Sequence, residues 1–372
     1  MIGFLLEKGG GAVMSLVKLF EKNQRSEGMT MGRREFLKLS AVSSVPLLLP
    51  NLFRKLSLDS RQEEIETSSP PAPLGRIATW WHQAVRKEPT PSGEWVAWKT
   101  RDDVIPIYAS VTGEAPWPTN PVWYQTKEGY IHSGYVQPVT NRPQPAITKI
   151  DEPGFWAEVC QPWTEARWSP ASPWVAKKLY YGTVYRVIGS VSDEENRIWY
   201  QLKEGITPWR PGPYVPAVSL RRIPPEELTP ISPGHPDKQI LIDRRAQTLS
   251  CLEGKREVFK TDISTGHHNT PTPRGEFRVL YKRHTRRMTV LNIEDPYDLP
   301  GVPYTVYFTW SGVAIHGTYW HNDYGRVHSH GCVNLRPKDA QWVFRWAEPV
   351  IEYKAYTKEV EESETGTPVI VV

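Results

Sequence analysis

"AIHGTYWHNDYGRVHSHGCVNL", residues 314–335, holds four of the ten histidines and one of the three cysteines of the chain. An apolar run leads up to His316, and a second short apolar segment follows Cys332. This pattern predicts a strand that ends at His316 and a connection that returns Cys332 beside it. The stretch therefore predicts a β-rich domain with a histidine and a cysteine at neighbouring strand ends.

Three kinds of chemistry fit such a cluster. Imidazole and thiolate are good zinc ligands, but the stretch has one cysteine, no C-x-x-C and no helical H-x-x-x-H, so we expect no metal. A purely structural cluster would need many hydrogen-bonding partners for its buried polar rings. The third hypothesis is a nucleophilic cysteine, which the spacing favours.

A nucleophilic cysteine needs help, because a free thiol is only ~3% thiolate at pH 7. A histidine within hydrogen-bonding distance can form a thiolate–imidazolium pair with it and lower its pKa. His330 is predicted in the same turn as Cys332, so the base must come from elsewhere, and His316 is the candidate. Gly331 lets the backbone approach a substrate closely. The N–H groups of Gly331 and Cys332 are candidates to stabilise an oxyanion.

The composition of the 372 residues indicates a globular protein, with 39% hydrophobic and 23% charged residues. A net charge of only +4 gives no reason to expect a nucleic-acid partner. The 35 prolines, 16 tryptophans and 17 tyrosines favour short strands joined by turns. Cys160 and Cys251 fall in different predicted domains, so we interpret both as buried small apolar residues rather than a disulfide.

The N-terminal segment resembles a twin-arginine export signal. "GRREFLKLSAVSSVPLLLPNLF", residues 32–53, has an arginine pair followed by a mostly apolar run that is short for a membrane span. A mobile amphipathic tail is the alternative. No clear A-x-A cleavage site is present, so an uncleaved segment would act as a membrane anchor. Residues 54–75 are polar and Pro/Ser-rich and predict a linker, which gives 1–75 as export signal and linker.

An internal repeat follows. "VWYQTKEG" (122–129) returns as "IWYQLKEG" (198–205), each copy among alternating apolar residues and turns. This pattern predicts two small antiparallel barrels and resembles bacterial SH3-like domains, at residues 76–145 and 155–226. The repeated aromatics either fill the barrel cores, which we favour, or line a ligand groove; they are Trp123, Tyr124, Trp199 and Tyr200.

The proline-rich stretch 221–239 predicts a linker to a last domain, residues 236–372. Alternating residues at 240–242 and 248–252 predict a strand hairpin, and "TGTPVIVV" at the C-terminus predicts a closing strand. One helix is expected from Pro337, because Pro suits the first helical position. Its apolar face would be formed by Ala340, Val343, Phe344 and Ala347, and Pro349 would end it.

The last domain resembles the L,D-transpeptidase (YkuD-type) family. The resemblance rests on His316-Gly317 followed by Ser329-His330-Gly331-Cys332-Val333-Asn334, on "STGHHNTPTPRGEF" (264–277) and on "LPGVPYTVYFTWSGVAIHG" (299–317). It covers about residues 236–372. It implies a mainly β chain in which two SH3-like barrels precede a β-rich sandwich domain with one or few short helices.

The resemblance also implies residue roles. Cys332 would be the nucleophile, His316 the base, and the Gly317 carbonyl would orient the imidazole. His330 would shape the site, with Gly331, Ser329 and Asn334 in support. The candidate substrate-binding residues are Tyr304, Tyr319 and His321.

Alternatives remain for the substrate-binding residues and their neighbours. For Tyr304 and Tyr307, packing is the favoured interpretation. Tyr319, His321 and His328 either line the cleft or face solvent. His267 and His268 are expected at the surface.

The reaction implied is acyl transfer on peptidoglycan stem peptides, giving 3→3 crosslinks without a cofactor, and carbapenem β-lactams would acylate Cys332. The expected location is outside the cytoplasmic membrane, by twin-arginine export. One alternative is an L,D-carboxypeptidase or hydrolase that uses the same cysteine. Another is a cell-wall-binding protein without catalysis.

Overall fold

The computed structural model describes residues 73–203, 211–290, 296–361 and 365–372. All of them belong to the compact unit Ser68–Val372. The predicted export signal and nearly all of the linker that follows it lie outside the described residues. No helix within the described ranges is long and apolar enough to cross a membrane.

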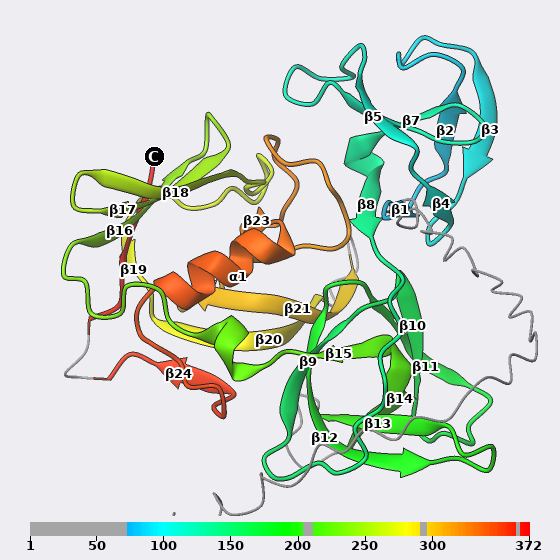
Figure 1. Cartoon of the computed structure of the whole chain (residues 1–372). Helices are drawn as coiled ribbons and strands as arrows, with labels where there is room; N and C mark the ends of the chain where they lie inside the picture. The colour runs from blue at the N-terminus through cyan, green and yellow to red at the C-terminus, as the bar shows by residue number, and fades with distance from the viewer. Residues whose placement is uncertain (1–72, 204–210, 291–295, 362–364) are drawn as a thin grey trace, which may run out of the picture. The chain divides into compact units, whose positions relative to one another are not determined.

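The described residues form 25 strands and one α-helix, so the prediction of a mainly β chain is confirmed (Figure 1). The strands fall into three groups along the sequence, at residues 74–139, 155–222 and 238–371. We call these the first β unit, the second β unit and the C-terminal domain.

The first β unit has a three-stranded sheet in the order β4-β1-β8 and a five-stranded sheet in the order β3-β2-β7-β6-β5. Its strands are β1 (Leu74–Ile77), β2 (Gln83–Arg86), β3 (Trp95–Lys99), β4 (Val104–Pro106), β5 (Ala109–Thr112), β6 (Val122–Gln125), β7 (Tyr130–His132) and β8 (Val136–Val139). Its core contains Ile77, Ile105, Ile107, Ile131 and Val136. The linker was predicted to reach residue 75, but Leu74 and Gly75 already pair with β8.

The second β unit is a seven-stranded antiparallel sheet in the order β11-β10-β14-β13-β12-β9-β15. Its strands are β9 (Phe155–Val159), β10 (Trp163–Arg167), β11 (Val175–Tyr180), β12 (Val184–Ser192), β13 (Ile198–Lys203), β14 (Pro211–Pro216) and β15 (Leu220–Arg222). Aliphatic and aromatic side chains from alternating positions form its core.

The repeated octapeptide forms β6 in the first unit and β13 in the second, although residues 204 and 205 of the second copy lie outside the described ranges. Trp123, Trp199 and Tyr200 are buried, while Tyr124 is partly buried. The favoured prediction that these aromatics fill the cores is therefore confirmed for Trp123 and Tyr200, whereas Trp199, although buried, also lines a surface pocket. The likeness of the two units to SH3-like domains stays a prediction.

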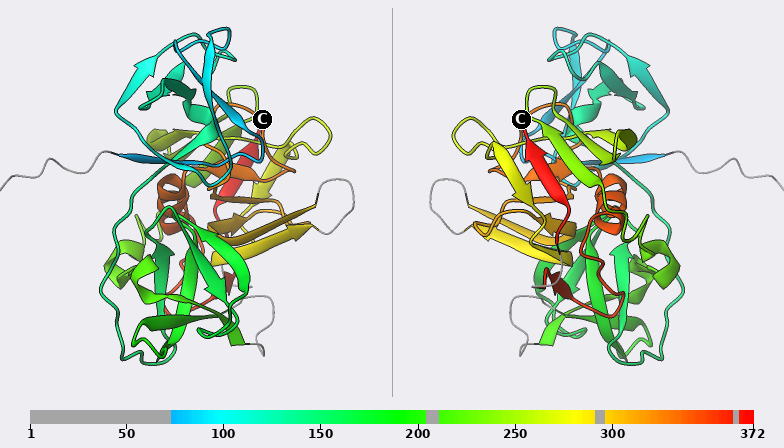
Figure 2. Two further views of the ribbon diagram at one scale, coloured as in Figure 1. Left: turned by 90° about the vertical axis from the view of Figure 1, so that its right-hand side faces the viewer. Right: turned by 90° about the vertical axis from the view of Figure 1, so that its left-hand side faces the viewer.

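The C-terminal domain contains two five-stranded sheets, in the orders β18-β17-β16-β25-β19 and β23-β22-β21-β20-β24. The first sheet contains β16 (Lys238–Asp243), β17 (Thr248–Glu253), β18 (Arg256–Asp262), β19 (Gly275–Arg278) and β25 (Pro368–Val371). The second contains β20 (Tyr281–Val290), β21 (Tyr297–Tyr307), β22 (Ala314–Gly317), β23 (Val333–Leu335) and β24 (Thr357–Glu359). The predicted hairpin is β16–β17, and the predicted closing strand is β25, the red arrow of Figure 2.

The helix α1 (Pro337–Trp346) begins and ends as predicted, and it packs against β21 and β22. Its predicted apolar face is buried at Ala340, Val343 and Phe344. Lys282 lies at its C-terminal end and donates hydrogen bonds to the carbonyls of Ala347 and Pro349, at 2.7 and 2.8 Å. These bonds cap carbonyls at the end of the helix, and burial lowers the pKa of the Lys282 amine to about 7.

The linker predicted at 221–239 is more structured than the sequence suggested. It contains the end of β15, the 3-10 turn Pro225–Leu228 and the start of β16. Ile223 and Leu228 are buried in the core of the C-terminal domain. The prolines mark turns here, but the apolar residues between them attach this segment to the domain that follows.

Candidate active site

The strands β22 and β23 are parallel neighbours, which brings together two segments separated by a loop at residues 318–332. Their register pairs Ile315 with Val333 and His316 with Asn334. Paired residues in a parallel ladder point to the same face, and alternate residues along a strand share a face. Cys332 directly precedes β23, so this pairing brings it to the end of the sheet beside β22.

His316 is buried at the end of β22 and has a defined tautomer. Its Nδ1 lies 3.1 Å from the carbonyl oxygen of Gly317, so Nδ1–H donates and Nε2 keeps its lone pair. Burial lowers the pKa of His316 to about 4, although the hydrogen bond to Gly317 acts in the opposite direction. The ring is a neutral base at neutral pH, and the predicted contact of Gly317 is present.

Cys332 is partly buried, and its Sγ donates a hydrogen bond to Gly312 O at 3.8 Å. Burial raises the pKa of this thiol, while the backbone of Ala314 acts to lower it. Burial penalises both charged forms, so it disfavours a resting thiolate–imidazolium pair. The arrangement instead suits a neutral thiol that loses its proton to a neutral base during attack.

The turn before Cys332 is held by Ser329. Its hydroxyl donates to the carbonyl of Cys332 and accepts from the N–H of Gly331 at 3.1 Å. The N–H of Gly331 is thus already engaged, which contradicts its predicted role as an oxyanion donor. Gly331 has φ = +121°, a backbone conformation that favours glycine, so this turn requires a glycine at position 331.

Residues 264–272 support this turn, a role that the sequence did not reveal. Ser264 exchanges backbone hydrogen bonds with Asn334, and the carbonyl of Thr265 accepts from the N–H of Ser329 at 3.1 Å. Thr272 Oγ1 donates to the carbonyl of Gly331 at 2.8 Å. A Cβ at Gly266 would lie 2.1 Å from the carbonyl oxygen of Thr270 and 2.9 Å from Gly331 Cα, so only glycine fits there.

His321 lines a pocket together with Thr318, Tyr324 and Arg336, and its side chain does not face solvent. It is buried, its Nε2 lies 3.0 Å from the side-chain amide of Asn334, and its Nδ1 accepts from the N–H of Asp323. Its ring stacks on His328 with centroids 4.4 Å apart. Burial, followed by the neighbouring His328 and His316, lowers the pKa of His321 well below its usual value. The neutral ring of His321 therefore contacts the side chain of Asn334 on β23.

Tyr319 and Tyr304 are misassigned as substrate-binding residues. Tyr319 is buried, donates to the carbonyl of Pro300 at 3.0 Å and stacks on Tyr180 of the second β unit. Tyr304 is buried against Phe344 of α1, as the favoured packing interpretation predicted. Side chains with so little exposed surface cannot contact a stem peptide.

A row of three aromatic rings lies near the thiol instead. Tyr307 stacks on Tyr281 with centroids 4.2 Å apart, and Tyr281 stacks on Trp310, which is 74% exposed. Burial raises the pKa of Tyr307 to about 12, and a negative charge at Cys332 acts in the same direction. No local sequence pattern predicted this row, because Tyr281 belongs to another strand and pairs with Tyr307 only through the β20–β21 register.

His330 is exposed, and its ring lies 5.4 Å from that of Tyr297 on β21. His330 lies two residues before Cys332, and its role in shaping the site stays a prediction. His267 and His268 are exposed, as expected. Within the described ranges, no group of three or more His, Cys, Asp or Glu side chains is arranged to hold a metal ion.

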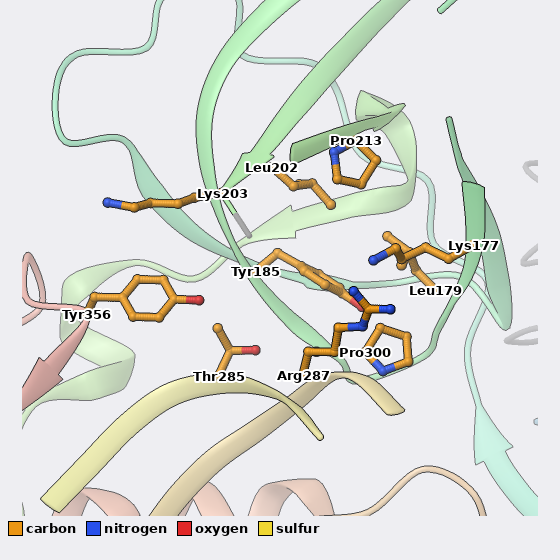
Figure 3. Close-up of a pocket in the computed structure, with 11 residues that line it drawn as sticks. Lys177, Leu179, Tyr185, Leu202, Lys203, Pro213, Thr285, Arg287, Pro300 and Tyr356 are labelled. Atoms are coloured by element: carbon orange, nitrogen blue, oxygen red, sulfur yellow. The ribbon is translucent and has the colours of Figure 1, made fainter. Parts of the chain in front are cut away.

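A separate small cavity of about 30 Å³ lies between the second β unit and the β20–β21 strands (Figure 3). Lys177 and Tyr185 line it from one side, and Thr285, Arg287 and Pro300 from the other. None of the predicted site residues lines this cavity.

The family model of the YkuD L,D-transpeptidase catalytic domain matches residues 237–371. The C-terminal domain is an L,D-transpeptidase catalytic domain. Its match agrees with the boundaries predicted for the last domain, 236–372. Membership of this family suggests an acyltransferase.

Curated relatives include L,D-transpeptidase 1 of Mycobacterium tuberculosis, strains ATCC 25618 / H37Rv and CDC 1551 / Oshkosh. Each is 41% identical over 97 residues, which is 24% of this chain and 38% of the relative. The chain thus spans well under half the length of the curated relatives that it matches.

Solved structures with similarity include the catalytic domain of an E. faecium L,D-transpeptidase acylated by ertapenem. It is 30% identical, with a TM-score of 0.29, over 37% of this chain and 97% of that one. L,D-transpeptidase 3 from Mycobacterium tuberculosis, in complex with a faropenem-derived adduct, is 22% identical with a TM-score of 0.30, over 43% and 72% of the two chains.

Proposed function

We propose that this protein is an exported peptidoglycan L,D-transpeptidase that forms 3→3 crosslinks through an acyl-enzyme on Cys332. The observation that carries the proposal is the parallel pairing of β22 and β23, which brings the His316 strand beside the segment that follows Cys332. The matched L,D-transpeptidase catalytic domain supports the same reaction class.

The first half-reaction transfers the acyl group of a tetrapeptide stem to the enzyme. Nε2 of His316 takes the Sγ proton as the sulfur attacks the carbonyl carbon of the third stem residue. The tetrahedral intermediate collapses, the amide bond to the terminal D-alanine breaks, and the imidazolium gives its proton to the departing amine. A thioester on Cys332 and free D-alanine result.

The second half-reaction transfers the acyl group to an acceptor. The side-chain amine of another stem attacks the thioester and passes its proton to His316, and the C–S bond breaks. The sulfur recovers the proton from the imidazolium. A new amide bond joins the third residues of two stems, and no cofactor takes part.

The charge states of the resting site support this scheme. His316 is neutral because burial lowers its pKa to about 4, and its Nδ1 is fixed by Gly317, so Nε2 is available across the neutral pH range. Cys332 keeps its proton, because burial raises its pKa. A thiol in this state resists adventitious oxidation yet reacts when a carbonyl is placed beside it.

Export by the twin-arginine route, attachment through an uncleaved N-terminal segment and wall contact by the two β units complete the proposal. They rest on the arginine pair and apolar run of residues 32–53 and on the repeat pattern. A carbapenem is the proposed inhibitor class, because solved relatives include one acylated by ertapenem and one with a faropenem-derived adduct.

Two alternative functions remain in view. An L,D-carboxypeptidase would use the same thioester with water as the acceptor, so it would yield shortened monomers. A wall-binding protein without catalysis would form no thioester.

The test is incubation of the purified protein with tetrapeptide muropeptides, followed by mass spectrometry. We expect crosslinked dimers and free D-alanine from the wild type and from Cys251→Ala, which removes a buried free thiol elsewhere. Cys332→Ala should yield neither product. Monomers that lack D-alanine, without dimers, would favour the carboxypeptidase. Absence of any product from the wild type would contradict the proposal.

A further inference from the structure

The loop that joins His316 to Cys332 lies against the first β unit, far away in the sequence. Asn322 donates its backbone N–H to the carbonyl of Gly134 at 3.1 Å and its side-chain amide to the carbonyl of Ser133 at 3.3 Å. The guanidinium of Arg76 donates to the carbonyl of Tyr319. This loop therefore finds partners for its backbone and its side chains in residues 74–139.

Asp323 is the centre of this contact. Its carboxylate is buried, and Oδ1 accepts a hydrogen bond from Trp117 Nε1 of the first β unit at 2.9 Å. Oδ2 lies 2.7 Å from His328 Nε2 and 3.6 Å from the guanidinium of Arg326. The same guanidinium lies over the Trp117 ring at 4.3 Å. A buried carboxylate needs such partners, because desolvation of an unpaired charge is costly.

Contacts within the loop lead from Asp323 to the reacting strands. The N–H of Asp323 donates to His321, which contacts Asn334, and Asn334 pairs with His316. The carboxylate of Asp323 holds the ring of His328. The backbone N–H of His328 donates to the carbonyl of Thr265 at 2.9 Å. Ser329 follows directly and forms the turn that holds Gly331 and the carbonyl of Cys332.

We propose that the first β unit is a working part of the active site, in which Trp117 and Asp323 are positioning residues for Cys332. The inference rests on the proposed cysteine chemistry and adds what sets its geometry. Neither residue touches the substrate. Trp117 holds Asp323, and Asp323 holds the two histidines that fix the turn before the nucleophile and the strand beside the base.

The position of Cys332 affects the rate of the proposed reaction. Attack by sulfur requires a near-attack geometry, and a misplacement of about 1 Å can cost roughly 100-fold in rate. Polar side chains flank Asp323 in the β22–β23 loop, and Tyr324 anchors the loop through its hydroxyl, which donates to the carbonyl of Leu335 at 3.1 Å. Loss of the Trp117 hydrogen bond would leave a buried carboxylate oxygen unpaired and let the loop rearrange.

The test compares Trp117→Phe with Trp123→Phe in the full chain. Both substitutions keep an aromatic ring and remove an indole N–H that donates one hydrogen bond. Trp117 donates to Asp323, whereas Trp123 donates to the carbonyl of Glu114 within the first β unit at 3.0 Å. Trp123 is the more buried of the two, so its variant controls for lost packing.

The readout is acylation of Cys332 by a carbapenem, followed by intact mass at a series of drug concentrations. We expect Trp117→Phe to lower the maximal acylation rate about 10-fold with little change in the half-saturating concentration. Trp123→Phe should acylate like the wild type, even if its melting temperature falls further. Asp323→Asn, which weakens both histidine and indole contacts, should match or exceed the effect of Trp117→Phe.

Equal acylation rates for Trp117→Phe and Trp123→Phe would overturn the proposal. So would a rate loss that follows the melting temperature across all three variants, since that indicates a general folding effect. A wild-type protein that forms no adduct at all would instead count against the proposed function, and the two failures are thus distinguishable.

Discussion

The two β units share a repeated strand sequence but join the C-terminal domain in different ways. The first unit contacts the β22–β23 loop through polar groups, chiefly Trp117 with Asp323 and Ser133 with Asn322. The second unit inserts the buried Trp156 into the core of the C-terminal domain. There the indole stacks on His284 with centroids 4.5 Å apart and donates to the carbonyl of Tyr353 at 2.7 Å.

This difference separates two tasks that a neighbouring unit can perform. Burial of a large aromatic ring contributes mainly stability, since it removes apolar surface from water. Hydrogen bonds at a polar contact contribute little net stability but define geometry. We therefore expect changes at the second unit to alter unfolding, and changes at the first unit to alter chemistry.

The largest expected effect on stability is at Trp156. Replacement of this fully buried ring by alanine leaves a cavity and removes a hydrogen bond, so Trp156→Ala should lower the free energy of unfolding by about 3–5 kcal/mol. Trp117→Ala, at a partly exposed ring, should cost about 1–2 kcal/mol. Urea unfolding measures both, and equal losses would remove the distinction between the two contacts.

A smaller effect, about 2 kcal/mol between pH 6 and pH 4.5, should appear as a pH dependence of the unfolding free energy at the second contact. His284 lies between the rings of Trp156 and Phe344, and burial lowers its pKa to about 3, well below the unfolded value near 6.5. The unfolded chain therefore binds more protons between pH 6.5 and 3. The free energy of unfolding should fall as the pH falls through this window, by about 1.4 kcal/mol per unit for this histidine.

The variant His284→Phe isolates that contribution. This variant should reduce the slope of unfolding free energy against pH, between pH 6 and pH 4.5, by the equivalent of about one proton. The buried His316 and His321 still contribute to the slope that remains. Urea unfolding at several pH values measures the slope. An unchanged slope would show that His284 is not a neutral, buried ring at this contact.

The smallest effect is expected at Asn322. Its side-chain amide donates to the carbonyl of Ser133 at 3.3 Å, so Asn322→Ala should cost about 0.5–1.5 kcal/mol in unfolding free energy. The rate of Cys332 acylation should also fall, although the folded fraction of the protein stays almost unchanged. A stability loss as large as that of Trp156→Ala would contradict a mainly geometric role for the first contact.

Local patterns in the sequence predicted the elements that depend on local causes. Pro337 and the spacing of Ala340, Val343 and Phe344 predicted α1, and alternation predicted β16, β17 and β25. The motif around Cys332 predicted that the histidine and cysteine segments meet, and β22 and β23 are indeed neighbours.

Features that depend on burial or on distant partners were missed. Burial disfavours the charged forms of His316 and Cys332, and burial cannot be derived from a local sequence pattern. His321 was expected either in the cleft or facing solvent, and its contacts with Asp323 and Asn334 bury it away from solvent. Trp117 lies 206 positions from Asp323, so no local pattern connects them.

The central claim is that His316 acts as a neutral base for the neutral thiol of Cys332, and its pH profile tests this most directly. The measurement is the rate of Cys332 acylation by a carbapenem between pH 6 and 8.5, for wild type and His316→Gln. We predict a nearly flat profile for the wild type, because His316, with a pKa of about 4, is unprotonated throughout this range. His316→Gln should react about 100-fold or more slowly at pH 7, with a rate that rises about tenfold per pH unit as thiolate forms. A wild-type rate that rises with pH in the same way, or an unchanged rate in His316→Gln, would contradict the account.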